Sequence, residues 1–165
     1  YSPMNYFEYE LTTPLKAIAS ISANINDNIL VCADYELIDY STSNLNVDNF
    51  RNEDGSEIFA VENNIIEYSY QKSENIRIGL EYKMNPFTLR TGYSRSSSAL
   101  VESEDLLSEN YSFGAGIDFG SYYFDLAYVL SQANDNYQMY SKQFIDSNDL
   151  AYTNHNVVIT LGLRY

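Results

Sequence analysis

The chain has no tryptophan, one cysteine and three prolines, and it lacks any apolar run near the roughly 20 residues that a membrane-spanning helix needs. The single cysteine, Cys32, excludes an internal disulfide framework. Basic residues are also scarce, with nine Lys and Arg against 23 Asp and Glu, which gives a formal net charge of −14. Because nucleic-acid binding requires clustered basic side chains, we expect no nucleic-acid partner.

The chain is instead rich in aromatic residues and in segments where apolar and polar residues alternate. It contains 17 tyrosines and eight phenylalanines among 165 residues. Strict alternation places successive side chains on opposite faces of a β-strand. Because alternating segments average out in a hydropathy scan, the lack of long apolar runs leaves a transmembrane β-barrel possible. The sequence therefore predicts an all-β fold.

Seven segments alternate in this way. They are TPLKAIASISANI (13–25), NILVCADYELIDYS (28–41), EYSYQKSENIRIGLEYKM (67–84), FTLRTGYSR (87–95), YSFGAGIDF (111–119), YYFDLAYVLS (122–131) and VVITLGLRY (157–165). An apolar strand such as the last one would aggregate through its unpaired edge in water, so we expect its face to be covered. Between the second and third strands, the spacing of apolar residues in 56–66 predicts a short helix capped by Ser56.

The connections between these strands alternate in length. Three are tight turns (26–28, 85–86 and 120–121), and three are long and polar (42–66, 97–109 and 133–153). Short turns on one side and long loops on the other are typical of a transmembrane β-barrel in the bacterial outer membrane. Aromatic residues beside the short turns would form a girdle at the periplasmic boundary: Tyr82, Phe87, Phe119 and Tyr122.

A water-soluble β-sandwich would show the same alternation. A sandwich core favours Val, Ile and Leu, whereas this chain repeats tyrosine near its strand ends, so we favour the antiparallel transmembrane β-barrel. Single-chain bacterial barrels have even strand numbers. The seven strands of 14–165 are therefore half of a fourteen-stranded barrel, or residues 7–11 add an eighth strand and close a small one. On either interpretation 1–165 is a single barrel unit, with 1–13 an extracellular segment or the extra strand.

Several motifs add a resemblance to a known family. They are the Thr-Pro that opens the first strand, Asp-Tyr-x-x-x-Asp-Tyr-Ser, Arg-x-Gly-x-Glu-Tyr-x-x-x-Pro-Phe-x-Leu-Arg-x-Gly-Tyr, Asp-Leu-Ala-Tyr and the terminal aromatic residue. In order and spacing, residues 12–165 resemble the C-terminal half of the FadL/TodX family of outer-membrane transporters. The resemblance departs at Ser41, where the family often has tryptophan.

The resemblance implies a channel for long-chain fatty acids and other hydrophobic molecules. It also implies that Tyr165 and Leu163 belong to a C-terminal signal for the barrel-assembly machinery. Outer-membrane lipids and lipopolysaccharide would be further partners, the latter through divalent cations held by the acidic loops. The alternative is a small eight-stranded barrel with a structural or adhesive role and no transport.

Ten charged side chains fall in the strand phase that would face the lumen. They are Lys16, Arg77, Lys83, Arg90 and Arg164, with Asp34, Glu36, Glu81, Asp118 and Asp125. One interpretation is a network of ion pairs that stiffens the barrel wall. The other is that Arg77 or Arg90 holds a fatty-acid carboxylate, since the guanidinium fork matches that group. The register suggests Glu81 as the partner of Arg90, and leaves Arg77 the freer cation.

The remaining candidates for chemistry are isolated. His155, expected in a loop, has no nucleophile and orienting acid spaced as a catalytic set requires. Asp34 and Glu36 share a face as paired glycosidase carboxylates do, but no sugar cleft accompanies them, so ion pairing is the simpler role. We predict no catalytic residues, no metal site and no cofactor.

Overall fold

The computed structural model describes residues 8–47, 57–103, 106–137 and 148–164, and a single antiparallel sheet dominates them. Its seven strands are β2 (Leu15–Asn26), β3 (Ile29–Asp39), β5 (Lys72–Met84), β6 (Phe87–Ser97), β7 (Leu107–Asp118), β8 (Tyr122–Tyr137) and β9 (Asn148–Leu163). The other elements are β1 (Glu10–Thr12), η1 (Tyr40–Thr42), β4 (Asn44–Asn46), α1 (Ala60–Ser69) and η2 (Val101–Ser103). None of the described helices is long and apolar enough to span a membrane.

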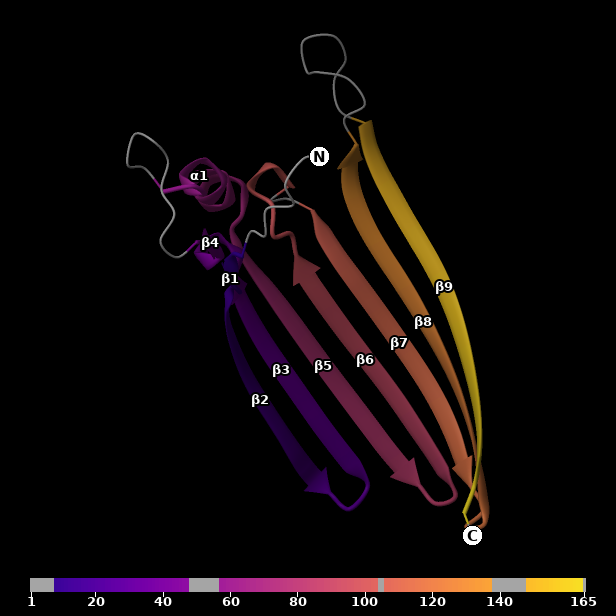
Figure 1. Ribbon diagram of the computed structural model, residues 1–165. Helices are drawn as coiled ribbons and strands as arrows, with labels where there is room; N and C mark the ends of the chain where they lie inside the picture. The colour runs from indigo at the N-terminus through magenta and orange to yellow at the C-terminus, as the bar shows by residue number, and fades with distance from the viewer. Residues whose placement is uncertain (1–7, 48–56, 104–105, 138–147, 165) are drawn as a thin grey trace, which may run out of the picture.

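The strands of the large sheet form a meander in the order β2-β3-β5-β6-β7-β8-β9, each antiparallel to its neighbour (Figure 1). The expected seven-stranded antiparallel arrangement is thus confirmed. Strands β2 and β9 are the two edges of this sheet, and the described residues do not pair them with each other. We call the end of the sheet with the long connections the loop end, and the end with the tight turns the turn end. Both edge strands run from the loop end to the turn end (Figure 1).

Local side-chain chemistry forms the tight turns where the sequence predicts them. Between β2 and β3, Oδ1 of Asn26 accepts hydrogen bonds from the backbone N–H groups of Asn28 and Ile29, both at 2.9 Å. This side chain replaces a backbone turn contact, as asparagine commonly does. Between β7 and β8, Gly120 has a φ of +83°, a conformation that other residues rarely adopt.

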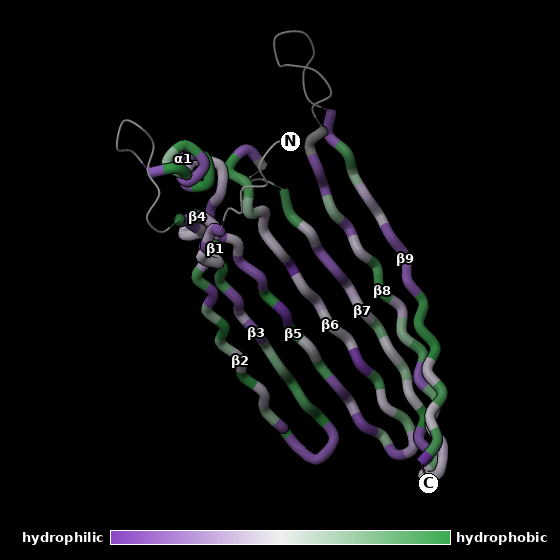
Figure 2. The backbone as a smooth tube through the Cα atoms, viewed as in Figure 1, coloured by the Kyte–Doolittle hydropathy of each residue, from purple (hydrophilic) through white to green (hydrophobic). Residues whose placement is uncertain are grey.

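The strand register separates the side chains into two faces. Because directly paired residues point to the same side, Ala33, Ile78, Tyr93, Tyr111 and Leu130 form one row across the sheet. The neighbouring row, on the opposite side, consists of Asp34, Arg77, Ser94, Asn110 and Ser131. We call these sides the apolar face and the polar face. Figure 2 shows apolar and polar residues alternating along β2, whereas the turn end of β3 is apolar at successive positions.

No described hydrophobic side chain is buried, so the sheet has no core of its own. On the apolar face, Ile78 is 50% exposed, Leu126 43% and Leu161 72%. A globular sheet covers such a face with a second layer of structure. Among the described residues no helix or second sheet lies on it, because α1 packs mainly against η1, β4 and η2 at the loop end (Figure 1).

Between β3 and β5, the structure differs from the sequence prediction in where the third strand begins and where the helix lies. The third strand begins at Lys72 rather than Glu67, because residues 60–69 form α1 and place Tyr68 in the helix. A helix was expected at 56–66, and it lies a turn further along, begins after Phe59 and receives no side-chain cap there. Ser56, its expected cap, lies outside the described residues.

Two further predictions, the long loop at 133–153 and an eighth strand at 7–11, also differ from the structure. The expected loop at 133–153 is much shorter, since β8 continues to Tyr137 and β9 starts at Asn148. His155 therefore lies in a strand, not in a loop. Residues 10 and 11, which belong to the eighth strand expected at 7–11, lie in β1 and pair with β4 in a separate two-stranded sheet. The described residues thus contain no eighth strand that closes the large sheet.

Candidate functional site

The polar face has a hollow floored by small residues. Cys32, Gly79, Gly92 and Ser112 are successive partners in one row across β3, β5, β6 and β7. Because these side chains are short or absent, the face is hollowed there by about 450 Å³, and Glu81, Arg90 and Asp125 border the hollow. Cys32 and Gly79 are closely packed. A Cβ added at Gly79 would lie only 2.8 Å from Sγ of Cys32, so a larger residue at this position would collide with it.

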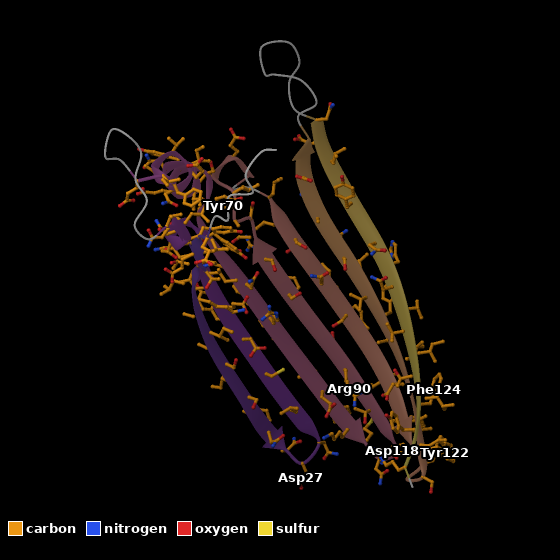
Figure 3. All side chains as sticks on the ribbon, in the orientation of Figure 1. Asp27, Tyr70, Arg90, Asp118, Tyr122 and Phe124 are labelled. Atoms are coloured by element: carbon orange, nitrogen blue, oxygen red, sulfur yellow. The ribbon has the colours of Figure 1, made fainter. Side chains whose placement is uncertain are left out.

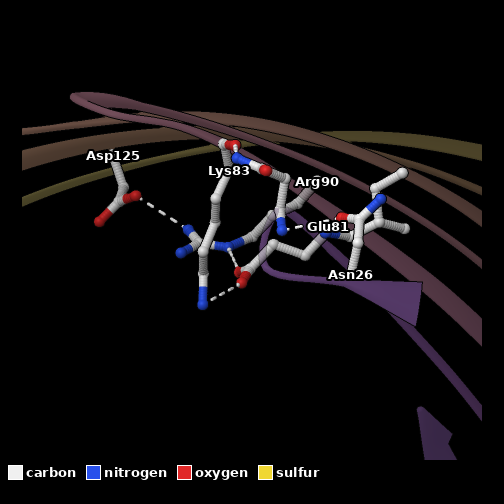
Figure 4. A network of polar contacts seen from close by, with 7 residues as sticks. Asn26, Glu81, Lys83, Arg90 and Asp125 are labelled. Carbon is white, nitrogen blue, oxygen red and sulfur yellow. Dashed lines mark hydrogen bonds and ion pairs between the residues drawn. The ribbon is translucent and has the colours of Figure 1, made fainter. Parts of the chain in front are cut away.

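The largest ion-pair cluster of the described residues, shown in Figure 4, lies two register positions from the hollow toward the turn end. Arg90 donates from Nε to Oε2 of Glu81 at 2.7 Å and from Nη1 to Oδ1 of Asp125 at 2.9 Å. Lys83 binds the other oxygen of Glu81 at 3.1 Å. The pairing of Glu81 with Arg90 follows from their direct register across β5 and β6. Arg90 is thus held by carboxylates on two different strands.

A second cluster lies on the loop-end side of the hollow. Glu36 is 7% exposed, and its Oε2 lies 3.2 Å from Nζ of Lys16 and 3.7 Å from Nη1 of Arg77. Its other oxygen accepts a hydrogen bond from Nδ2 of Asn75 at 2.9 Å. Arg77 is therefore the most weakly held cation of the polar face. Asp34 lies opposite Arg77 in the register, but makes no ion pair or hydrogen bond within the described residues.

A third group closes the turn end of the polar face. Arg164 donates from Nη1 to Oδ2 of Asp118 at 2.8 Å, and its guanidinium lies 5.3 Å from the ring centre of Tyr123. The Tyr123 ring covers Gly162, where a Cβ would collide with it. Figure 3 shows Asp118 close to Tyr122 and Phe124 at this end, far from Tyr70 at the loop end.

Of the ten charged residues expected on the polar face, nine make ion pairs there and Asp34 makes none within the described residues. Arg77 and Arg90 are not brought together, because each belongs to a different cluster. Leu163 lies on the apolar face at the end of β9 and is 74% exposed. Tyr165 lies outside the described residues.

The apolar face carries hydrogen-bonded tyrosines at about one height along several strands, which we did not predict from the sequence. Tyr93 donates to Oε1 of Glu109 at 2.6 Å, and Tyr111 donates to its Oε2 at 3.4 Å. Further along the sheet, Oη of Tyr128 lies 2.7 Å from Nδ1 of His155. The signal that could have revealed them is the recurrence of tyrosine toward the loop end of the apolar phase in neighbouring strands.

No histidine accompanies the ion pairs of the polar face within the described residues. His155 and the polar-face carboxylates lie on opposite sides of the sheet, which excludes a catalytic set between them. The described residues contain no group of His, Cys, Asp or Glu that could hold a metal ion. Comparisons of the chain with protein-family models, with curated proteins and with solved structures find no match.

Proposed function

We propose that this chain forms part of the wall of an outer-membrane β-barrel that takes up hydrophobic molecules, in the manner of the FadL/TodX family that its motifs resemble. The observation that carries the proposal is the uncovered apolar face of a seven-stranded sheet without a core. Lipid would cover this face, while neighbouring strands satisfy the backbone, as a membrane requires.

The two ends of the apolar face also support a membrane position. Phe119 and Tyr122 stack at the turn end with ring centres 4.8 Å apart, and Tyr111 lies eight residues from Phe119 toward the loop end. Eight residues span about 27 Å along a strand, or about 20 Å along the axis of a barrel whose strands tilt by about 40°. Outer-membrane barrels place aromatic girdles at both edges of an apolar band of about 25 Å.

The polar face supports its role as a lumen wall. Most of its ionic side chains are paired across strands, so they would stiffen the wall beside the small-residue hollow. Fourteen strands would accommodate a wider lumen than eight, because barrel diameter grows with strand number. The alternative of a small structural or adhesive barrel needs an eighth strand, and β1 pairs with β4 instead.

Two adjacent residues offer a test of the membrane position. Cys32 lies on the polar face and Ala33 on the apolar face of β3. In outer-membrane vesicles holding the full-length protein, a charged maleimide should label native Cys32 at least tenfold faster than the cysteine of a Cys32→Ser/Ala33→Cys variant. Labelling of both positions at the same rate would contradict a lipid-covered apolar face.

A measurement of uptake tests the proposed transport of hydrophobic molecules. Cells expressing the full-length protein should accumulate a radiolabelled hydrophobic compound faster than cells carrying the empty vector. A barrel that assembles normally but leaves uptake unchanged would favour the structural role over transport.

A further inference from the structure

The polar face offers no excess positive charge to a ligand. Each of its five basic side chains has a carboxylate oxygen within 4 Å, and the tightest contacts are those of Arg90 and Arg164. A carboxylate-bearing ligand would have to displace one of these partners. The face therefore has no preformed site for an anion among the described residues.

Of the ten charged side chains expected on the polar face, the one that has no ion pair within the described residues is an acid, Asp34. Arg77 is only 3.7 Å from its partner Glu36, which leaves it the most available cation. However, Asp34 lies directly opposite Arg77 in the register and has no partner within the described residues. A ligand carboxylate that approached Arg77 would meet both Asp34 and Glu36, so Coulomb repulsion offsets the attraction.

The loop end adds a long-range field of the same sign. Toward the loop end, from the register row of Tyr35, Ile76, Arg95, Glu109 and Gln132 onward, the described segments are 8–19, 35–47, 57–76, 95–103, 106–109, 132–137 and 148–153. They carry twelve carboxylates against three basic residues, Lys16, Lys72 and Arg95, so the negative charge is in excess. Clustered charge of one sign at an entrance raises the local concentration of opposite charges and lowers that of like charges. On α1, Glu62 and Glu67 contribute to this field beside the exposed apolar side chains of Val61 and Ile65.

We infer that the hydrophobic molecules taken up through this wall are uncharged or amine-bearing, and that carboxylates are disfavoured. This inference rests on the proposed function and narrows its substrate class. An uncharged molecule meets no electrostatic barrier at the loop end. An ammonium group is attracted there, and it reaches Asp34, which has no ion pair within the described residues, two residues along β3 from Cys32 in the hollow. Long-chain fatty acids, the example that the family resemblance suggests, carry the one charge that both regions oppose.

Three probes with the same alkyl chain test this preference. We would measure uptake of radiolabelled decanol, decylamine and decanoate by cells expressing the full-length protein, with empty-vector cells subtracted, in buffers of low and high ionic strength. At low ionic strength, decanol and decylamine uptake should exceed decanoate uptake about tenfold, as electrostatic steering permits. The ratio of decylamine to decanoate should fall as salt shortens the Debye length.

Variants connect the preference to named residues. Asp34→Asn, combined with Glu62→Gln and Glu67→Gln, should lower the ratio of decylamine to decanoate uptake by at least threefold. Asp27→Asn, which removes an exposed carboxylate at the turn end, is the matched control and should leave the ratio unchanged. The amount of assembled protein in the outer membrane is measured for every variant.

The possible outcomes separate this inference from the proposed function. Uptake of decanoate above the other two probes, abolished in Arg77→Ala, would overturn the inference and establish Arg77 as a carboxylate site while leaving transport intact. An unchanged uptake ratio in the triple variant would also overturn it. Uptake of none of the three probes above the empty-vector level would overturn the proposed function, and the inference with it.

Discussion

Arg90 on β6 reaches across β7 to bind Asp125 on β8, with Nη1 and Oδ1 2.9 Å apart. The strand between them has Gly114 opposite Arg90 and Gly116 opposite Asp125. A Cβ at Gly116 would collide with Oδ1 of Asp125, whereas at Gly114 its nearest neighbour would lie 3.5 Å away, an ordinary contact. A missing side chain on the middle strand therefore permits a contact between strands that are not neighbours.

We predict that Gly116→Ala displaces the Asp125 carboxylate and breaks its ion pair with Arg90. The pair is partly exposed, so the loss should lower the free energy of unfolding by about 1 kcal/mol. Gly114→Ala, on the same strand and face, should change it by less than about 0.5 kcal/mol. Urea unfolding of the refolded protein, followed by tyrosine fluorescence, would measure both, and equal effects would contradict the role given to Gly116.

The two candidate arginines should differ in their effect on stability. Arg90→Ala leaves Asp125 without its partner and should cost about 1–2 kcal/mol of unfolding free energy. Arg77→Ala removes one long contact of 3.7 Å and should cost less than about 0.5 kcal/mol. Urea unfolding would measure both variants. A larger loss of unfolding free energy in Arg77→Ala than in Arg90→Ala would contradict the conclusion that Arg90 is the more tightly held cation.

Arginine substitutions should distinguish the two faces of the sheet. In a bilayer, Leu126→Arg and Ile78→Arg should each destabilise the folded protein by about 2–4 kcal/mol, the cost of a cation at the lipid midplane. Thr160→Arg should cost much less, because Thr160 pairs with Asp125 on the polar face. Similar costs at all three positions would rule out a lipid-covered apolar face.

Removal of Tyr165 should impair assembly of the barrel in cells, since the resemblance assigns the terminal aromatic strand to recognition by the assembly machinery. The readout is the amount of heat-modifiable barrel in the outer membrane. Tyr152→Asp changes an exposed aromatic residue of the same strand near the loop end and serves as the control. Normal assembly without Tyr165 would remove the support that this residue gives to an outer-membrane location.

The sequence predicts the sheet well where one face is consistently apolar. The alternation in 72–84 and 87–95 places Glu81 opposite Arg90 once the tight turn at Asn85-Pro86 is recognised, and the structure confirms that contact. It fails where both faces become polar, as in 132–137, because the paired strands there carry no apolar phase to reveal them. The contact of Arg90 with Asp125 was equally hidden, since it joins β6 to β8 across the intervening β7 and depends on Gly116 of that strand.

The direction of the edge strands has a consequence for assembly. Because β2 and β9 both run from the loop end to the turn end, joining them directly would produce a parallel seam. A second copy inserted in the same orientation would offer its β2 to β9 of the first, and that seam would be parallel too. Closure with antiparallel pairing throughout therefore requires an odd number of additional strands, the first and last of which run from the turn end to the loop end.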